Sequence, residues 1–201
     1  MDCSDPAEVA VAARVLAGPA RLGPVRLVCV DGPAGSGKTT FADALADALA
    51  AVGVVDDGGR VSVVTVHLDD LYDGWTGLDD SLWPRLAAQV LEPLRRGCPG
   101  RFQRYDWVAG RFAQWVPVPL ARVLVLEGCG SARRACDPLA TCRVWVEAPD
   151  DLRLARGLAR DGADSRAHWL EWMSAERVHF AAERTALRAD VRLDAWGTMP
   201  T

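Results

Sequence analysis

The chain has 201 residues, of which 50% are hydrophobic and 25% are charged, and its formal net charge is −4. This balance excludes disordered and fibrous proteins, and the length suits one domain. The acidic charge argues against nucleic acid as a partner, and no apolar run approaches the ~20 residues that a membrane helix needs, so we expect no membrane association.

Apolar, β-rich segments alternate with helical segments along the chain, which is typical of a parallel α/β sheet. In chain order, we expect a strand at 25–30, a helix at 39–52, a strand at 61–66, a helix at 83–96, a β-hairpin at 101–118, strands at 123–126 and 143–146, helices at 150–160 and 165–187, and a short strand near 190–193. Because the strands are continuously apolar, the sheet should be covered on both faces.

A phosphate-binding motif, G-x-x-x-x-G-K-[ST], follows the first strand at residues 32–39. Its glycines let backbone N–H groups converge on phosphate oxygens, and the helix that follows adds its positive N-terminus. Lys38 is the only lysine beside 22 arginines, so an N-K-x-D guanine-reading element is excluded. We predict that ATP is bound by Gly32, Ala34, Gly35, Ser36, Gly37, Lys38, Thr39 and Thr40.

Acidic residues follow two of the predicted strands, where carboxylates of a parallel sheet point into the ligand crevice. Asp69 is a candidate base for an attacking hydroxyl, and Asp70 takes that role if the register differs. A turn or helix-cap role is the alternative for both. Glu127 ends the third sheet strand and, with the Thr39 hydroxyl, is the candidate Mg²⁺ site; a plain loop acid is its alternative.

Three arginines, Arg153, Arg156 and Arg160, recur at i, i+3 and i+7 on the helix at 150–160, so they fall on one face within about 60°. Such a stripe can clamp phosphates during transfer, although a solvated charged face is the usual explanation. The next helix carries three glutamates that we interpret as solvated surface charges: Glu171, Glu176 and Glu183.

The predicted hairpin is rich in aromatic side chains, with arginines among them. Aromatic rings with polar tips suit stacking on a flat base and hydrogen bonding to a sugar, whereas a small hairpin core is the alternative. The residues concerned are Phe102, Arg104, Tyr105, Trp107, Arg111, Phe112 and Trp115.

Together these motifs resemble the uridine kinase-like branch of P-loop kinases, relatives of phosphoribulokinase and pantothenate kinase, over roughly residues 24–165. The resemblance lies in the P-loop, Asp69-Asp70-Leu71-Tyr72, Tyr105-Asp106-Trp107, Leu126-Glu127-Gly128 and the segment 156–161. It implies a three-layer P-loop NTPase sandwich with a mainly parallel sheet, in one domain over 1–201. An insert at about 69–120 would bind the acceptor, and a lid would span about 150–166.

Carried over residue by residue, the resemblance implies catalytic roles for Lys38, Asp69, Arg156 and Arg160. It implies acceptor binding by Tyr72, Asp79, Tyr105 and Trp107, to which we add Arg111 of the insert. The histidine that the family carries three residues after the aromatic of its Y-D-F element is replaced by Gly110.

We therefore expect ATP- and Mg²⁺-dependent phosphoryl transfer to a hydroxyl of a small molecule, with a nucleoside as the expected acceptor. One alternative is a nucleoside monophosphate kinase, in which Arg104 and Arg111 would bind the acceptor's phosphate. The other is a nucleotide-binding regulatory protein without transfer. The six cysteines form no metal-like pattern, and we expect them reduced in a cytoplasmic protein without a secretory leader. Homo-oligomerisation is left open.

Overall fold

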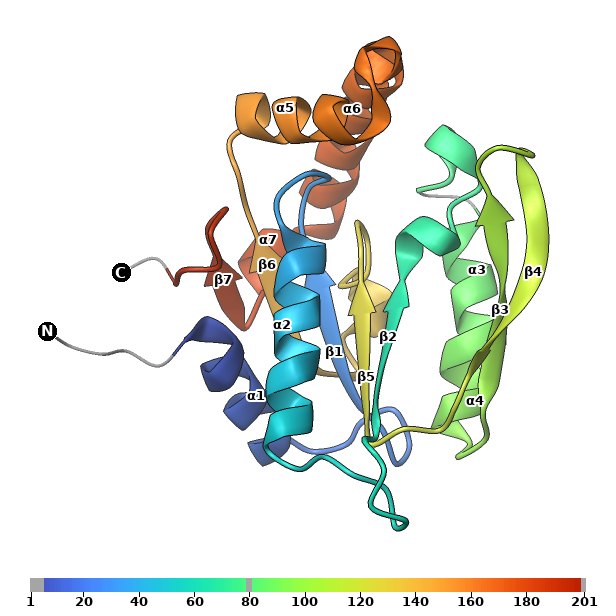
Figure 1. Ribbon diagram of the computed structural model, residues 1–201, viewed down its shortest axis with the longest axis vertical. Helices are drawn as coiled ribbons and strands as arrows, with labels where there is room; N and C mark the ends of the chain where they lie inside the picture. Colours follow the sequence, from blue (N-terminus) through green and yellow to red (C-terminus); the bar gives the residue numbers. More distant parts are fainter. Residues whose placement is uncertain (1–5, 79–80, 200–201) are drawn as a thin grey trace, which may run out of the picture.

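In the computed structural model, which describes residues 6–78 and 81–199, five parallel strands form one sheet (Figure 1). The strand order is β2 (Val63–His67), β5 (Val123–Glu127), β1 (Arg26–Asp31), β6 (Ala140–Val146) and β7 (Val191–Leu193). All five strand predictions are confirmed, with no end shifted by more than three residues. The expected α/β class with a parallel sheet flanked by helices is confirmed as well.

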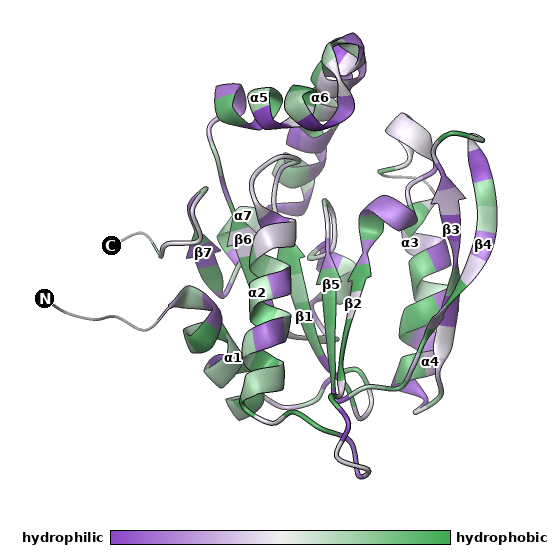
Figure 2. Ribbon diagram, in the orientation of Figure 1, coloured by the Kyte–Doolittle hydropathy of each residue, from purple (hydrophilic) through white to green (hydrophobic). Residues whose placement is uncertain are grey.

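Successive residues of the central strands point to opposite faces, so the sheet supports two separate cores. In β1, Val28 and Val30 pack on one side, whereas Leu27 and Cys29 pack on the other. Figure 2 shows the resulting hydrophobic strands between the helical layers. The helices of the first side are α1 (Ala7–Ala17) and α2 (Lys38–Ala51).

The second side of the sheet is covered largely by the insert between β2 and β5. Short helical turns come first, at Leu68–Asp70 and Gly74–Thr76. The predicted helix at 83–96 is confirmed as α3 (Leu82–Leu86), a π-helical turn at Ala87–Leu91, and α4 (Glu92–Arg95). The predicted hairpin is confirmed as β3 (Gly100–Asp106) paired antiparallel with β4 (Arg111–Val118).

Three helices follow β6, and α5 (Asp150–Asp161) and α6 (Arg166–Glu183) lie beyond the carboxyl ends of the strands (Figure 1). The predicted helix at 165–187 is interrupted at Arg184, which adopts a left-handed conformation with φ of 54°, and it resumes as α7 (Thr185–Arg188). The predicted helix at 150–160 is confirmed.

Helix α1 was not expected from the sequence. Its four buried positions carry small or β-branched side chains. They lie in a run of mostly alanine and valine, in which the alternation of apolar and polar residues shows no strong helical period. The buried positions are Ala7, Val11, Ala12 and Val15. Alanine, the strongest helix former, makes up five of its eleven residues, and packing against α2 stabilises the helix further. Among the described residues, no helix is long and apolar enough to cross a membrane, and the five cysteines they include are free.

Candidate active site

A cavity of about 1040 Å³ opens at the carboxyl ends of the strands, below α5 and α6. The phosphate loop (residues 32–39) forms its middle, through Ala34, Gly35, Gly37, Lys38 and Thr39. Because β2 and β7 are the two edge strands, the lining residues that follow them mark opposite ends of the cavity: Asp69, Tyr72 and Trp75 after β2, and Trp196 and Gly197 after β7, with Glu8 of α1 also on the wall. Of the other predicted ATP-binding residues, Thr40 lines the cavity, whereas Gly32 and Ser36 do not appear on its wall.

The phosphate loop needs glycine at Gly32 because β6 approaches so closely. A Cβ atom built on Gly32 would lie 2.1 Å from the backbone oxygen of Val146, and the φ angle of Gly32 is 146°. Gly37, with φ of 105°, ends the loop, and α2 begins at Lys38. The loop therefore opens a helix whose positive N-terminus faces the cavity.

Lys38 is held inside the curl of the loop. Only 6% of the residue is exposed, and its Nζ donates to the backbone oxygen of Pro33 at 2.9 Å. Burial by itself would lower the lysine pKa, but the negative charges nearby, including Glu127 and Asp69, outweigh it and the pKa is raised. Lys38 is therefore a firmly charged ammonium at the cavity floor.

Asp31 supports the loop from below, a role that the sequence analysis missed. Its buried carboxylate accepts the backbone N–H of Gly32 at 2.7 Å, of Gly130 at 2.9 Å and of Ala132 at 2.8 Å. Burial raises the pKa of Asp31, against the effect of these hydrogen bonds. The last residue of β1 thus joins the phosphate loop to the segment after β5.

The two candidate bases point to different places. Asp69 lines the cavity, and its Oδ2 lies 4.0 Å from Nη1 of Arg160. The Asp69 side chain is 62% exposed, but it is exposed inside the cavity, where the surrounding protein excludes much of the solvent. This loss of hydration, together with the negative charge of Glu127, raises the pKa of Asp69. Asp70 instead pairs with Arg104 of the hairpin at 3.1 Å.

The candidate magnesium residues face the same cavity. Thr39 and Glu127 both line it, and Oε2 of the buried Glu127 lies 2.8 Å from Nδ1 of His67. The hydrogen bond to Glu127 raises the pKa of His67, although burial opposes it. A hydroxyl and one carboxylate fit Mg²⁺, which commonly takes few protein ligands and completes its shell with water and phosphate oxygens. His67 was not singled out from the sequence.

The three arginines of the α5 stripe differ in where they lie: two line the cavity and one is buried. Arg156 donates to the backbone oxygens of Gly35 at 3.1 Å and Ala195 at 3.3 Å, and with Arg160 it lines the cavity. Arg153 is turned inward and buried, and its Nη1 donates to the backbone oxygen of Ala34 at 3.0 Å. The stripe is therefore no freely solvated face.

Aromatic side chains surround the end of the cavity that holds Asp69. Trp75 stacks on His168 with ring centroids 5.4 Å apart, and its ring also meets those of Trp107, Trp169 and Trp172. These tryptophans line the cavity together with Tyr72. The sequence analysis had found Tyr72 and Trp107 but not the contributions of α6, because residues 168–172 carry no recognisable motif.

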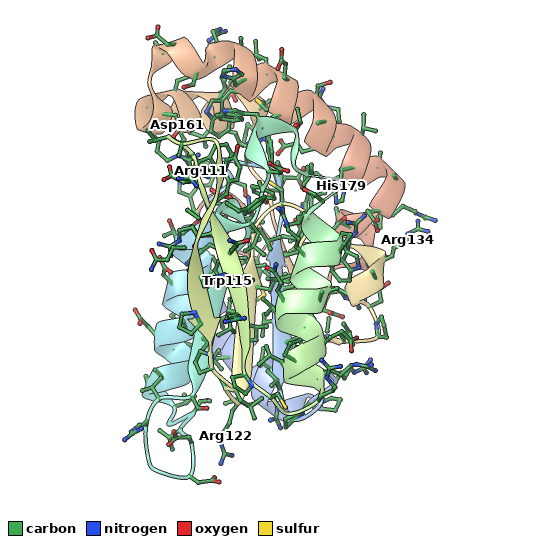
Figure 3. The ribbon with its side chains drawn as sticks, turned by 90° about the vertical axis from the view of Figure 1, so that its right-hand side faces the viewer. Arg111, Trp115, Arg122, Arg134, Asp161 and His179 are labelled. Atoms are coloured by element: carbon green, nitrogen blue, oxygen red, sulfur yellow. The ribbon has the colours of Figure 1, made fainter. Side chains whose placement is uncertain are left out.

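Two predicted acceptor-binding residues, Tyr105 and Arg111, do not line the cavity, and a third lies outside the described residues. Tyr105 packs on Trp107 and Phe112, with centroids 5.3 Å and 5.1 Å apart. Arg111 lies near the tip of the hairpin, at the same end of the molecule as Asp161 (Figure 3). Asp79 lies outside the described residues. The acceptor roles of these three residues stay predictions.

Glu176 corrects the interpretation of α6 as a helix with only solvated glutamates. It is 1% exposed, and its Oε2 accepts the backbone N–H of Ala34 at 2.8 Å and the indole N–H of Trp172 at 3.1 Å. The i, i+4 spacing of Trp172 and Glu176, with Trp169 on the same face, was the available signal that this face is buried. Glu171 is exposed, and Glu183 is partly buried.

The chain is similar in fold to several solved structures, among them two that carry kinase names. A possible uridine kinase from Bacillus stearothermophilus is similar over 94% of this chain and 97% of its own, with 22% identity and a TM-score of 0.67. A candidate fructose transport system kinase from Silicibacter gives 23% identity, coverage of 92% and 98%, and a TM-score of 0.61. The YGR205w protein gives 10% identity, 88% coverage of both chains and a TM-score of 0.53. Neither family models nor curated protein sequences match the chain significantly.

Proposed function

We infer that the protein is an ATP-dependent kinase that transfers the γ-phosphoryl group to a hydroxyl of a small molecule, with a nucleoside as the favoured acceptor. The observation that carries this inference is the cavity itself. Lys38 on the phosphate loop, Asp69 at the end of β2 and Arg160 on α5 all face it, and Arg160 lies 4.0 Å from Asp69.

The two ends of the cavity suggest how donor and acceptor would lie. The triphosphate would sit on the phosphate loop, and the donor's base would extend toward Trp196 and Glu8, away from Asp69. The acceptor would occupy the aromatic end, where rings such as Trp75 and Tyr72 offer flat apolar surface beside Asp69.

Transfer would proceed in line. The acceptor oxygen bonds to the γ-phosphorus, its proton passes to the Asp69 carboxylate, and the bond to the β–γ bridging oxygen breaks to leave ADP. Lys38 and the guanidinium groups of Arg156 and Arg160 would stabilise the charge that develops on the phosphoryl oxygens. Thr39 and Glu127 would hold Mg²⁺, which supplies further charge neutralisation when bound.

The experiment is an acceptor panel. The protein, ATP and Mg²⁺ are incubated with nucleosides, nucleoside monophosphates, sugars and pantothenate, and ADP formation and the phosphorylated product are measured. Acceptor-dependent ADP with a hydroxyl acceptor supports the proposal. Phosphorylation of monophosphates alone would favour the nucleotide kinase alternative, although Arg104 is already paired with Asp70. ATP binding without transfer to any acceptor would favour a regulatory protein.

We further propose that the active enzyme works in the cytoplasm.

A further inference from the structure

The backbone of Ala34, in the phosphate loop, is held at both its N–H and its carbonyl oxygen by side chains from outside the loop. Its N–H donates to Oε2 of Glu176 at 2.8 Å, and its carbonyl oxygen accepts from Nη1 of Arg153 at 3.0 Å. The same Arg153 nitrogen lies 2.5 Å from Oε1 of Glu176. One carboxylate and one guanidinium therefore bracket the backbone of a single loop residue, one on each of its two peptide groups.

This bracket is buried and charged. Glu176 is 1% exposed and Arg153 is 3% exposed. Two charges removed from water carry a large desolvation cost, and their mutual attraction often does no more than offset that cost. Replacement by apolar side chains of similar volume is commonly neutral or stabilising, so stability alone does not explain an ion pair here.

The position of the pair connects it to the phosphate-binding groups. Cys129 Sγ lies 3.6 Å from Oε2 of Glu176 and 3.8 Å from Nζ of Lys38, and it contacts the backbone oxygen of Gly32 at 3.3 Å. The Cys129 side chain therefore separates the Glu176 carboxylate from the Lys38 ammonium. The negative charge of Glu176 would repel phosphates unless Arg153 neutralised it.

We propose that Glu176, acting with Arg153, is a positioning residue that fixes the first half of the phosphate loop for the nucleotide triphosphate. Glu176 accepts the hydrogen bond of the Ala34 N–H, so this donor is not available to a phosphate oxygen. The hydrogen bond instead fixes the conformation of the loop before the nucleotide binds. The donor class, a nucleoside triphosphate, rests on the proposed function; the restraint on the loop rests on the contacts alone.

The test compares Glu176→Gln with Glu183→Gln. Glu183 ends the same helix and also accepts hydrogen bonds and ion pairs, but from Arg134 and Arg133, away from the loop. ATP affinity is measured by calorimetry with Mg²⁺ and no acceptor, alongside the melting temperature. We expect Glu176→Gln to weaken ATP binding about 10-fold and to raise KM for ATP, with KM for the acceptor unchanged. Glu183→Gln should leave ATP affinity as it is.

ATP affinity of Glu176→Gln within twofold of the unaltered protein, or an equal loss in Glu183→Gln, would overturn the proposal. If Glu176→Gln does not fold, Arg153→Lys takes its place: it keeps the charge but loses the forked geometry, and unchanged ATP affinity there would be equally decisive. An unaltered protein that binds ATP but phosphorylates no acceptor defeats the proposed function alone. One that does not bind ATP defeats both proposals.

Discussion

Arg160 and Asp69 meet across the cavity, with Nη1 of Arg160 4.0 Å from Oδ2 of Asp69. Arg160 also pairs with Asp161 on its own helix, at 2.7 Å through Nε. Arg160 and Asp69 both line the cavity that Lys38 also faces. The charge of Arg160 lowers the pKa of Asp69, whereas burial and Glu127 raise it, and the raising effects prevail.

The first prediction concerns the acid side of the pH–rate profile. A base must be ionised to accept a proton, so kcat/KM should fall as the pH drops through the pKa of Asp69. Because that pKa is raised, the fall should lie above the ordinary aspartate value of 3.8. Arg160→Gln removes a charge that lowers this pKa, so its profile should fall at a higher pH than that of the unaltered protein.

The profile is measured as initial ADP formation at subsaturating acceptor, with protein stability checked at every pH. Asp69→Asn serves as the control, because its residual activity should lack this acid fall. A shift toward lower pH in Arg160→Gln would show that Asp69 is not the group that titrates.

The second prediction separates the two neighbouring aspartates. Asp69→Asn should reduce kcat by roughly 10²- to 10⁴-fold, the usual loss when a general base is removed. Asp70→Asn should reduce kcat by less than about 10-fold, because Asp70 pairs with Arg104 at the hairpin and does not line the cavity. Steady-state kinetics on the acceptor found in the panel decide the question, and equal losses would contradict the assignment.

The third prediction concerns the single lysine. Lys38→Arg keeps the charge, but a forked guanidinium is too bulky for a site where the ammonium is 6% exposed and bonded to Pro33. Turnover should fall at least about 100-fold, as after loss of one group that stabilises the transition state. The protein should still fold, with a melting temperature lowered only by the local overpacking, which thermal unfolding checks. Full activity in this variant would undo the argument.

Much of the fold could be predicted because its signals are local. The strand at 25–30 and the motif at 32–39 combine apolar runs with glycine spacing, and both need only neighbouring residues to be recognised. The register of Asp69 and Asp70 could not be settled, because it depends on the helical turn Leu68–Asp70 that follows β2.

The missed residues depend on contacts that are distant in sequence. Glu176 reaches the phosphate loop across 142 positions, and Asp31 reaches Ala132 across 101. A glutamate on a helix is usually solvated. The i, i+4 spacing from Trp172 indicates a buried face for Glu176, but only tertiary packing shows that the face covers the phosphate loop. The same holds for Trp196, which enters the cavity only because β7 lies beside β6.

The fourth prediction is a stability effect with a pH dependence. Asp190 accepts from Nε of Arg143 at 3.1 Å and from its backbone N–H at 2.8 Å, and its side chain is 24% exposed. Burial would raise the Asp190 pKa, but these hydrogen bonds outweigh it and the pKa is lowered. The ionised form therefore stabilises the fold at neutral pH, and this contribution is lost as the pH falls through the lowered pKa.

Asp190→Asn should cost about 1 kcal/mol of unfolding free energy at pH 7, and the difference from the unaltered protein should shrink below about pH 4. Urea unfolding at both pH values measures it. Asp57→Asn is the control: Asp57 also pairs with an arginine, Arg122 at 2.9 Å, but is fully exposed and should show no measurable effect. A difference for Asp190→Asn that grows on acidification would contradict the sign.

The fifth prediction tests which end of the cavity receives the donor. Trp196 lies in the turn after β7, is 75% exposed, and lines the cavity beside Gly197 and opposite the end that holds Asp69. Loss of base stacking on an aromatic ring typically costs about 1–3 kcal/mol. Trp196→Ala should therefore raise KM for ATP roughly 5- to 150-fold, with kcat and the acceptor KM little changed, because stacking would contribute equally in ground and transition states.

Trp115→Ala is the matched control for Trp196→Ala. Trp115 is also a partly exposed tryptophan, but it lies on the hairpin with Arg101 over its ring at 4.6 Å, away from the cavity (Figure 3). Its removal should leave both KM values unchanged. If Trp196→Ala raised the acceptor KM instead, the donor and acceptor would have to exchange ends. Asp69 would then lie beside the donor's nucleobase. It would be too far from the transferred phosphoryl group to accept the proton of the attacking hydroxyl.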